Sequence, residues 1–263
     1  MTLTWHHSLL DAVRTLAREA GRAILDIYHG DFAVTAKADD SPLTAADQAA
    51  EAVILAGLAR LTPDLPVVAE ESVAAGHMPD IRRGLFWLVD PLDGTREFVK
   101  RNGEFTVNIG LVESGRPVLG VVFAPAIDRL YAAAGPGTAI VEAEGVVRGI
   151  HVRSPRPEGL VVMTSRSHGD DAALEAYLAP MRVAECIKAG SSLKFCIVAA
   201  GEADLYPRLG HTMEWDTAAG HAVLLAAGGS VRTLDGLDLT YGKPGLHNPD
   251  FVAAGQEMGH HGP

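Results

Sequence analysis

The stretch WLVDPLDGT, residues 87–95, contains the strongest local signal in the chain. An apolar strand-like run ends in two carboxylates, Asp90 and Asp93, with Pro91 and Gly94 controlling the turn between and after them. Carboxylates held on a tight loop at a strand's end can converge on one hard cation. Glycine permits the close approach or unusual backbone angle that such a loop needs. An ordinary acidic surface turn would contain the same residues, so this segment alone leaves the two interpretations even.

Three other carboxylates also lie at the border of an apolar element. Glu70 and Glu71 follow a strand-like VVA run, and Asp216 precedes an apolar helical segment. Taken singly, Glu70 and Glu71 are more simply a charged strand end, and Asp216 a helix cap. Asp47 has a similar explanation, because it stands three residues after Thr44 as in a capping box.

The combination changes this balance. Four carboxylates from separate segments would repel one another strongly without a cation between them: Glu70, Asp90, Asp93 and Asp216. With two or three Mg²⁺ ions the same set provides what phosphoryl transfer to water requires, since the metals polarise phosphate oxygens and lower the pKa of an attacking water. The 11 histidines include no zinc-type pair such as H-E-x-x-H, so oxygen ligands and Mg²⁺ are favoured.

Apolar periodicity predicts helices and strands that alternate along the chain, with a strand meander in the middle. Helices are expected over 8–29, 44–60, 170–178, 191–201 and 215–227, and strands over 65–69, 85–89, 105–112, 118–124, 160–164 and within 128–141. Ser8 with Asp11, like Thr44 with Asp47, has the spacing of a helix cap and its partner. The pattern indicates a layered α/β (α+β) architecture. The segment RSPRPEG, 153–159, suggests a boundary between an N-terminal lobe, 1–152, and a C-terminal lobe, 153–263.

Composition limits the partners. A formal net charge of −11 argues against nonspecific nucleic-acid binding. A small anionic substrate stays compatible, because a metal and a few basic residues can neutralise a site locally.

Two cysteines, Cys186 and Cys196, favour a reducing cytoplasm over a disulfide framework or zinc site. The start MTLTWHH lacks a signal-peptide pattern, and no apolar run reaches membrane-spanning length. We expect a soluble cytoplasmic protein, with peripheral association at the inner membrane left open.

Three motifs in order resemble the signature set of the inositol monophosphatase superfamily: VAEES (68–72), DPLDGT (90–95) and EWDTAAGHAVLLAAGG (214–229). The similarity extends over nearly the whole chain. It implies an αβαβα sandwich whose two lobes form one catalytic unit, and Li⁺-sensitive, Mg²⁺-dependent hydrolysis of phosphomonoesters. This sequence does not depart from the family's metal-ligand pattern at any position, which implies an active enzyme.

Residue by residue, the resemblance implies metal ligation by Glu70, Asp90, the Leu92 carbonyl, Asp93 and Asp216. Thr95, helped by Asp47, falls on the position that orients and deprotonates the nucleophilic water, and we count Glu70 with this catalytic group. Glu71 would support the metals from behind or hold a third one. Most of these ligands belong to the N-terminal lobe.

Four further segments resemble 3'(2'),5'-bisphosphate nucleotidases of the CysQ type: DGTREFVKRNGEFTVNIGLV (93–112), SRSH (165–168), GSSLKFC (190–196) and LYPRLG (205–210). In that pattern Ser165 and His168 lie beside the nucleoside, and the 5'-phosphate is held by Ser191, Lys194 and Arg208. A guanidinium can bind phosphate as a fork and an ammonium as a point charge. The predicted substrate contacts also include Asp93, Gly94, Thr95 and Asp216.

Each basic residue has a simpler explanation when taken alone. Lys194 could extend to solvent from its helix, His168 could be a loop or capping residue, and Arg208 could be an ordinary surface arginine. As a set that matches one subfamily they favour binding. Arg96, by contrast, is expected on a solvated face together with Lys100 and Arg101.

The expected reaction is in-line attack of water on the 3'-phosphorus of 3'-phosphoadenosine 5'-phosphate, giving AMP and phosphate. The resemblance implies a role in sulfate assimilation, with 3'-phosphoadenylyl sulfate as a further substrate. The alternatives are an inositol monophosphatase or sugar bisphosphatase, a haloacid dehalogenase-type phosphatase, and a noncatalytic metal- or nucleotide-sensing protein. The dehalogenase type needs aspartates two residues apart, whereas Asp90 and Asp93 are three apart. Monomer and homodimer are both compatible with the sequence.

Overall fold

The structure of the protein is a computed structural model that describes residues 2–36, 42–166 and 171–256. Its helices are α1 (Thr2–Tyr28), α2 (Ala45–Leu61), α3 (Glu70–Ala74), α4 (Thr95–Val99), α5 (Asp171–Leu178), α6 (Leu193–Ala199) and α7 (Glu214–Ala226), with 3-10 turns η1 (Pro125–Ile127) and η2 (Pro244–Leu246). The first sheet has the order β3 (Val67–Ala69), β4 (Leu85–Asp93), β5 (Thr106–Glu113), β6 (Arg116–Ala124), β7 (Arg129–Ala134), β8 (Ile140–Ala143), β9 (Val146–Gly149). The second has the order β11 (Val183–Ala189), β10 (Leu160–Ser165), β12 (Leu205–Arg208), β14 (Phe251–Ala254), β13 (Ser230–Thr233), and β1 (Val34–Ala36) pairs with β2 (Pro42–Thr44).

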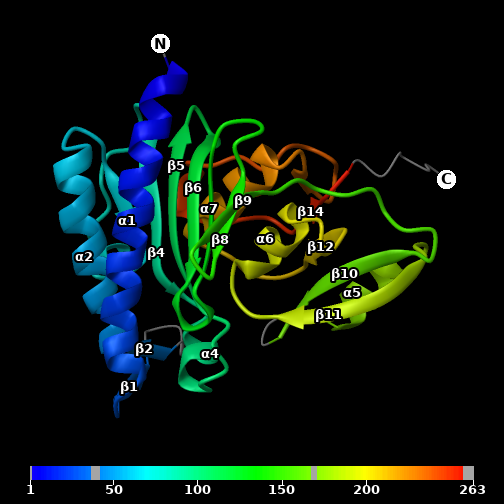
Figure 1. Cartoon of the computed structure of the whole chain (residues 1–263), viewed down its shortest axis with the longest axis horizontal. Helices are drawn as coiled ribbons and strands as arrows, with labels where there is room; N and C mark the ends of the chain where they lie inside the picture. Colours follow the sequence, from blue (N-terminus) through cyan, green and yellow to red (C-terminus); the bar gives the residue numbers. More distant parts are fainter. Residues whose placement is uncertain (1, 37–41, 167–170, 257–263) are drawn as a thin grey trace.

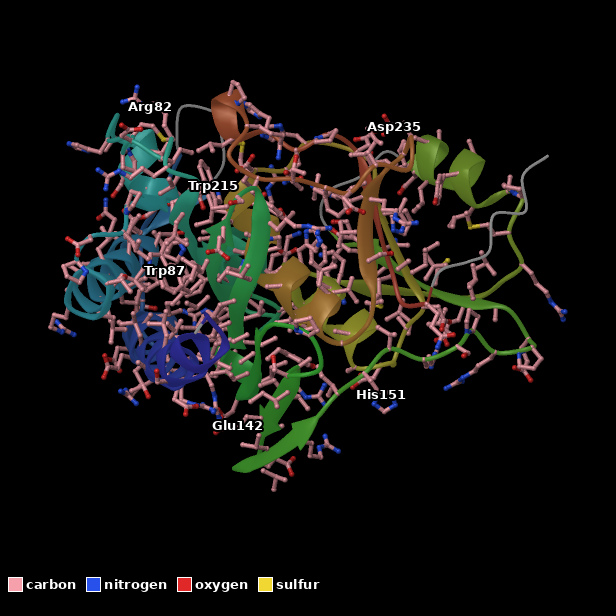
Figure 2. The ribbon with its side chains drawn as sticks, turned by 90° about the horizontal axis from the view of Figure 1, so that it is seen from above. Arg82, Trp87, Glu142, His151, Trp215 and Asp235 are labelled. Atoms are coloured by element: carbon pink, nitrogen blue, oxygen red, sulfur yellow. The ribbon has the colours of Figure 1, made fainter. Side chains whose placement is uncertain are left out.

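Helices and sheets alternate in five layers. α1 and α2 pack on one face of the first sheet, where the fully buried Trp87 lies on their side (Figure 2). α6 and α7 lie between the two sheets (Figure 1). α5 packs through Tyr177 and Leu178 against the second sheet. The layered αβαβα sandwich predicted from the sequence is confirmed.

α7 approaches the first sheet closely because glycines of β5 and β6 face it. A Cβ at Gly120 would stand 2.2 Å from the carbonyl oxygen of Ala219, and one at Gly110 would stand 3.0 Å from the Cβ of Ala218. No side chain fits in such a space, so these strand glycines mark a backbone contact. The contact places the N-terminal turn of α7, with Asp216, beside the carboxyl end of β4.

Helix ends follow the predicted signals in some places and not in others. The Thr44–Asp47 capping box is confirmed, since Thr44 N donates to Asp47 Oδ2 at 2.7 Å and Ala46 N to Thr44 Oγ1 at 3.2 Å. The predicted cap at Ser8 is wrong, because α1 already begins at Thr2. Residues 2–7 contain neither glycine nor proline to stop the helix from extending.

Other elements were not indicated by the sequence patterns. β9, β11, β13 and β14 are short or partly exposed strands with weak apolar alternation. The predicted helix over 191–201 begins later, at Leu193, so Ser191 precedes it with a left-handed φ of 49°. Across the described ranges, none of the helices has the length and apolar character needed to span a bilayer.

Candidate active site

A β-bulge in β4 brings the two aspartates of the DPLDGT motif to one side of the sheet. Asp90 pairs with Asn108 and Asp93 pairs with Thr106, so three steps along β4 match two steps along β5. Residues three apart in a regular strand face opposite sides, whereas one extra residue restores the same side. The loop is closed by Leu92 N, which donates to Asp90 Oδ1 at 2.9 Å.

The predicted carboxylates line one cavity of about 570 Å³ at this end of the sheet. Asp90 and Asp93 come from β4, Glu70 from the start of α3 and Asp216 from the first turn of α7. Trp215, next to Asp216, is labelled in Figure 2 and marks this region. The structure therefore brings together all four carboxylates that the motifs singled out.

Two of these carboxylates, Asp93 and Asp216, have raised pKa values, in part because of neighbouring charges. Burial raises the pKa of Asp93 to about 6, a rise that Lys194 opposes and Glu70 increases. Burial, and then the charges of Asp93 and Glu70, hold the pKa of Asp216 well above its ordinary range. In this carboxylate wall Asp90 is buried and the other three carboxylates are partly buried, and like charges gathered in this way are unfavourable unless a cation lies between them.

The donor set fits a hard divalent cation such as Mg²⁺. The wall offers the carboxylate oxygens just described, and Leu92 lines the same cavity. Oxygen ligands of this kind are what Mg²⁺ prefers. Among the residues that the structure describes, no three carboxylate, imidazole or thiolate groups are already gathered into a complete metal cluster. The carboxylates are thus distributed around a shared space.

Thr95, at the start of α4, links this wall to α2. Its hydroxyl lies 3.3 Å from Asp47 Oδ1 and 3.2 Å from the carbonyl oxygen of Leu92. Asp47 is buried, and its other oxygen accepts hydrogen bonds from the backbone N–H and the hydroxyl of Thr44. Gly94, before Thr95, has a φ of 88°, the left-handed conformation that glycine adopts without strain.

The same cavity is also lined by the basic residues Lys194 and Arg208, which together form its basic wall. Lys194 is only 3% exposed, so it does not extend to solvent, and its ammonium donates to the carbonyl oxygens of Ala189 and Ser191. Burial lowers the pKa of Lys194 to about 8, while Asp93 raises it and Arg208 lowers it further. The ammonium also lies 5.2 Å from the ring centroid of Tyr206. Carbonyls and a ring face orient this cation inside the protein.

Arg208 is also buried, at 7% exposed, and is not a surface arginine. Its Nη2 donates to the carbonyl oxygen of His211 at 2.8 Å, and its Nη1 lies 3.3 Å from Ser165 Oγ. Ser165 and Ser191 line the cavity as predicted. His168 lies outside the described residues.

Several residues at the site were not predicted. Asp93 Oδ2 accepts hydrogen bonds from Ser192 N at 2.6 Å and Asn108 Nδ2 at 3.3 Å. Glu51 accepts from Glu71 N and from the hydroxyl of Ser72, which fixes the start of α3. Glu51 could have been recognised, because it is a charged residue on the buried face of an apolar helix.

Arg96, predicted on a solvated face and left out of the site, is exposed but also lines the cavity. Glu71, expected to support the metals from behind or to hold a third one, is not among the described residues that line the cavity, and its role stays a prediction.

Comparison with known proteins gives consistent results. The sequence profile of the inositol monophosphatase family matches residues 5–260. The 3'(2'),5'-bisphosphate nucleotidase CysQ of Salmonella typhimurium is 51% identical over 246 residues, covering 92% of this chain and 98% of that protein. The crystal structure of CysQ from Bacteroides thetaiotaomicron has a TM-score of 0.79 at 38% identity, covering 95% of this chain and 98% of the other. An inositol monophosphatase from Anabaena has a TM-score of 0.75 at 28% identity, covering 94% and 90%.

Proposed function

Because the chain belongs to the inositol monophosphatase family, we propose that it is a 3'(2'),5'-bisphosphate nucleotidase that converts 3'-phosphoadenosine 5'-phosphate to AMP and phosphate. One observation carries the substrate: four carboxylates and two buried cations, Lys194 and Arg208, line a single cavity. Hydrolysis of a monophosphate needs the carboxylate wall, whereas a second phosphate on the substrate accounts for the cations. The 51% identity with a named bisphosphate nucleotidase supports this substrate class.

The proposed cofactor is Mg²⁺, as two or three ions. The residues that would hold it are Glu70, Asp90, the carbonyl of Leu92, Asp93 and Asp216. When bound, the metal would polarise the 3'-phosphate oxygens and lower the pKa of water, which is the chemistry that phosphomonoester hydrolysis requires.

Thr95 and Asp47 would handle the attacking water. The Thr95 hydroxyl is within reach of both Asp47 Oδ1 and the Leu92 carbonyl, so it can accept a hydrogen bond from a water while it donates to one of them. Asp47 can then take up the proton that the water loses. Water supplies the nucleophile directly, so no phosphoenzyme is needed. Glu70, which lines the same cavity, belongs to the same proposed catalytic group.

The basic wall would bind the other end of the substrate. Arg208 and Lys194 would hold the 5'-phosphate together with the hydroxyl of Ser191, and Ser165 with His168 would lie beside the nucleoside. Since the 5'-phosphate lies away from the reacting phosphorus, the same wall could accept 3'-phosphoadenylyl sulfate as a further substrate. Gly94 would let the backbone of residues 90–95, the metal loop, approach the 3'-phosphate.

A side-by-side assay tests the proposal. Phosphate release would be measured from 3'-phosphoadenosine 5'-phosphate and from inositol 1-phosphate, with and without Mg²⁺ and with added Li⁺. We expect strong preference for the nucleotide, no activity without Mg²⁺ and inhibition by Li⁺. Preference for inositol phosphate would contradict the assignment of the basic wall and leave the carboxylate wall intact. Metal-independent hydrolysis would contradict the carboxylate wall instead.

A further inference from the structure

Glu104, in the loop between α4 and β5, binds Arg166 and the backbone of Gly190 through its carboxylate. Both of its oxygens accept from the guanidinium fork of Arg166, Oε2 from Nε and Oε1 from Nη2, each at 2.7 Å. Oε2 also accepts from Gly190 N at 2.8 Å. One carboxylate thereby connects the end of β10 to the loop that precedes α6.

Backbone contacts reinforce this connection. A Cβ at Gly190 would stand 2.6 Å from the carbonyl oxygen of Glu104, and a Cβ at Gly94 would stand 3.1 Å from the same oxygen. The Glu104 carbonyl therefore lies between the glycine of the metal loop and the glycine of the α6 loop. Arg166 adds a hydrogen bond from Nη2 to the carbonyl oxygen of Lys188 at 2.9 Å, so it holds the end of β11 as well.

The other side of the α6 loop has its own anchor. Ser192 N donates to Asp93, and its buried hydroxyl donates to Asn108 Oδ1 at 2.7 Å. Ser191 lies between this anchor and the one at Gly190, with a left-handed φ that a non-glycine residue adopts only when its surroundings impose it. The Ser191 carbonyl oxygen in turn accepts from the Lys194 ammonium.

We propose that Glu104 and Arg166 are positioning residues that fix Ser191 and Lys194 for the 5'-phosphate, and so set the preference for a substrate with two phosphates. This inference rests on the function proposed above. Removing the pair releases the Gly190 side of the loop, while the Ser192 anchor still holds Asp93. The loss should therefore fall on recognition of the second phosphate and spare the cleavage chemistry.

The test compares two substrates that lose the same 3'-phosphate: 3'-phosphoadenosine 5'-phosphate and adenosine 3'-monophosphate, which lacks the 5'-phosphate. For Glu104→Gln and Arg166→Gln we expect kcat/KM for the bisphosphate to fall between about 10-fold and 100-fold, mainly through KM, the scale of a small misplacement of a binding group. Activity on the monophosphate should stay near its wild-type value. For Arg166→Lys, kcat/KM for the bisphosphate should lie between the values for the wild type and for Arg166→Gln, since lysine keeps the charge but lacks the fork.

A double variant and a matched control complete the design. Glu104→Gln with Arg166→Gln should lose less than the product of the two single losses, because both single variants weaken the shared Glu104–Arg166 contact. Arg82→Gln removes a similar fork, with Asp80, at an exposed site whose Arg82 points outward in Figure 2, and should change neither substrate's kinetics. The Glu104–Arg166 pair is partly exposed, so its loss should leave the fold intact.

Two outcomes would overturn the inference: an equal loss on both substrates, or no loss on either. If the wild-type protein itself showed no preference for the bisphosphate, the proposed function would fail first. That result is visible before any variant is made.

Discussion

The two walls of the cavity carry opposite charge, yet both are oriented mainly by neutral backbone groups. On the carboxylate wall, each of the three aspartates accepts a hydrogen bond from a backbone N–H. On the basic wall, Lys194 and Arg208 donate to backbone carbonyl oxygens. A hydrogen bond to a neutral group fixes the direction of a charged side chain without neutralising it. Both walls are thus oriented, and their charges act on whatever enters the cavity.

The difference between the walls shows what the cavity is suited to bind. Burial makes the ionised state costly on both sides, as the raised pKa of Asp93 and the lowered pKa of Lys194 show. An occupant that presents cations to one wall and an anion to the other relieves both costs. Metal ions beside one phosphate, with a second phosphate further away, have this distribution of charge.

The largest expected effect comes from removing one charge of the carboxylate wall. Asp90→Asn keeps the shape and the acceptor for Leu92 N but loses the charge that would bind a metal. We expect kcat to fall at least about 1,000-fold on both the bisphosphate and adenosine 3'-monophosphate, since metal-ion catalysis contributes several kcal/mol and each 1.36 kcal/mol is tenfold in rate. Mg²⁺-dependent phosphate release measures this. Asp235→Asn, an exposed position, is the control. Full hydrolysis by Asp90→Asn would mean that the metal wall is misassigned.

A smaller, selective effect is expected from the basic wall. Arg208→Ala should lower kcat/KM for the bisphosphate about 100-fold, which corresponds to hydrogen bonds to a charged group worth about 1.5–3 kcal/mol. The loss on adenosine 3'-monophosphate should be much smaller, because that substrate offers no 5'-phosphate. Arg208→Lys should recover part of the loss by restoring the charge without the fork. Equal losses on both substrates would remove the functional distinction between the two walls.

The walls also differ in how far the sequence could predict them. The carboxylates follow apolar strands or begin a helix within short motifs, and although none was decisive singly, the combination of the four was sufficient to single them out. For Lys194 and Arg208 the motifs suggested a role, but burial depends on packing between sheets and could not be derived locally. The layered α/β architecture was predictable because apolar periodicity records which face of each element is covered, whereas the αβαβα order of the layers was implied by the family resemblance.

Contacts between distant segments were beyond the sequence. Ser192 and Asp93 are 99 positions apart, and Gly190 and Glu104 are 86 apart. No periodicity or local motif encodes such a pair; it appears only when the two sheets are packed on α6 and α7. The β4 bulge was only partly predictable from the sequence. Pro91 and Gly94 predicted a turn directly after a strand over 85–89, whereas β4 continues through the bulge to Asp93, and this register against β5 had to be observed.

Replacing a buried polar group outside both walls should change stability and leave catalysis unchanged. His221 on α7 is such a group, with Nδ1 2.9 Å from the Tyr241 hydroxyl. Burial lowers its pKa to about 3, and Arg116 and Lys243 contribute in the same direction. Below about pH 6.5 the unfolded chain therefore binds a proton that the folded protein does not bind. The free energy of unfolding falls as the pH decreases.

Between pH 7 and pH 5 this group should cost about 2 kcal/mol of the free energy of unfolding, at 1.36 kcal/mol per pH unit below the unfolded pKa. His221→Gln retains a hydrogen-bonding partner for Tyr241 but does not titrate, so its stability should decline less over the same range. Urea unfolding of both proteins at the two pH values measures the difference. At pH 7, phosphate release by the variant should equal that of the wild type, because the polar groups that act on substrate are confined to the two walls. Parallel declines would show that His221 takes up its proton equally in both states, and a loss of activity would extend the site along α7.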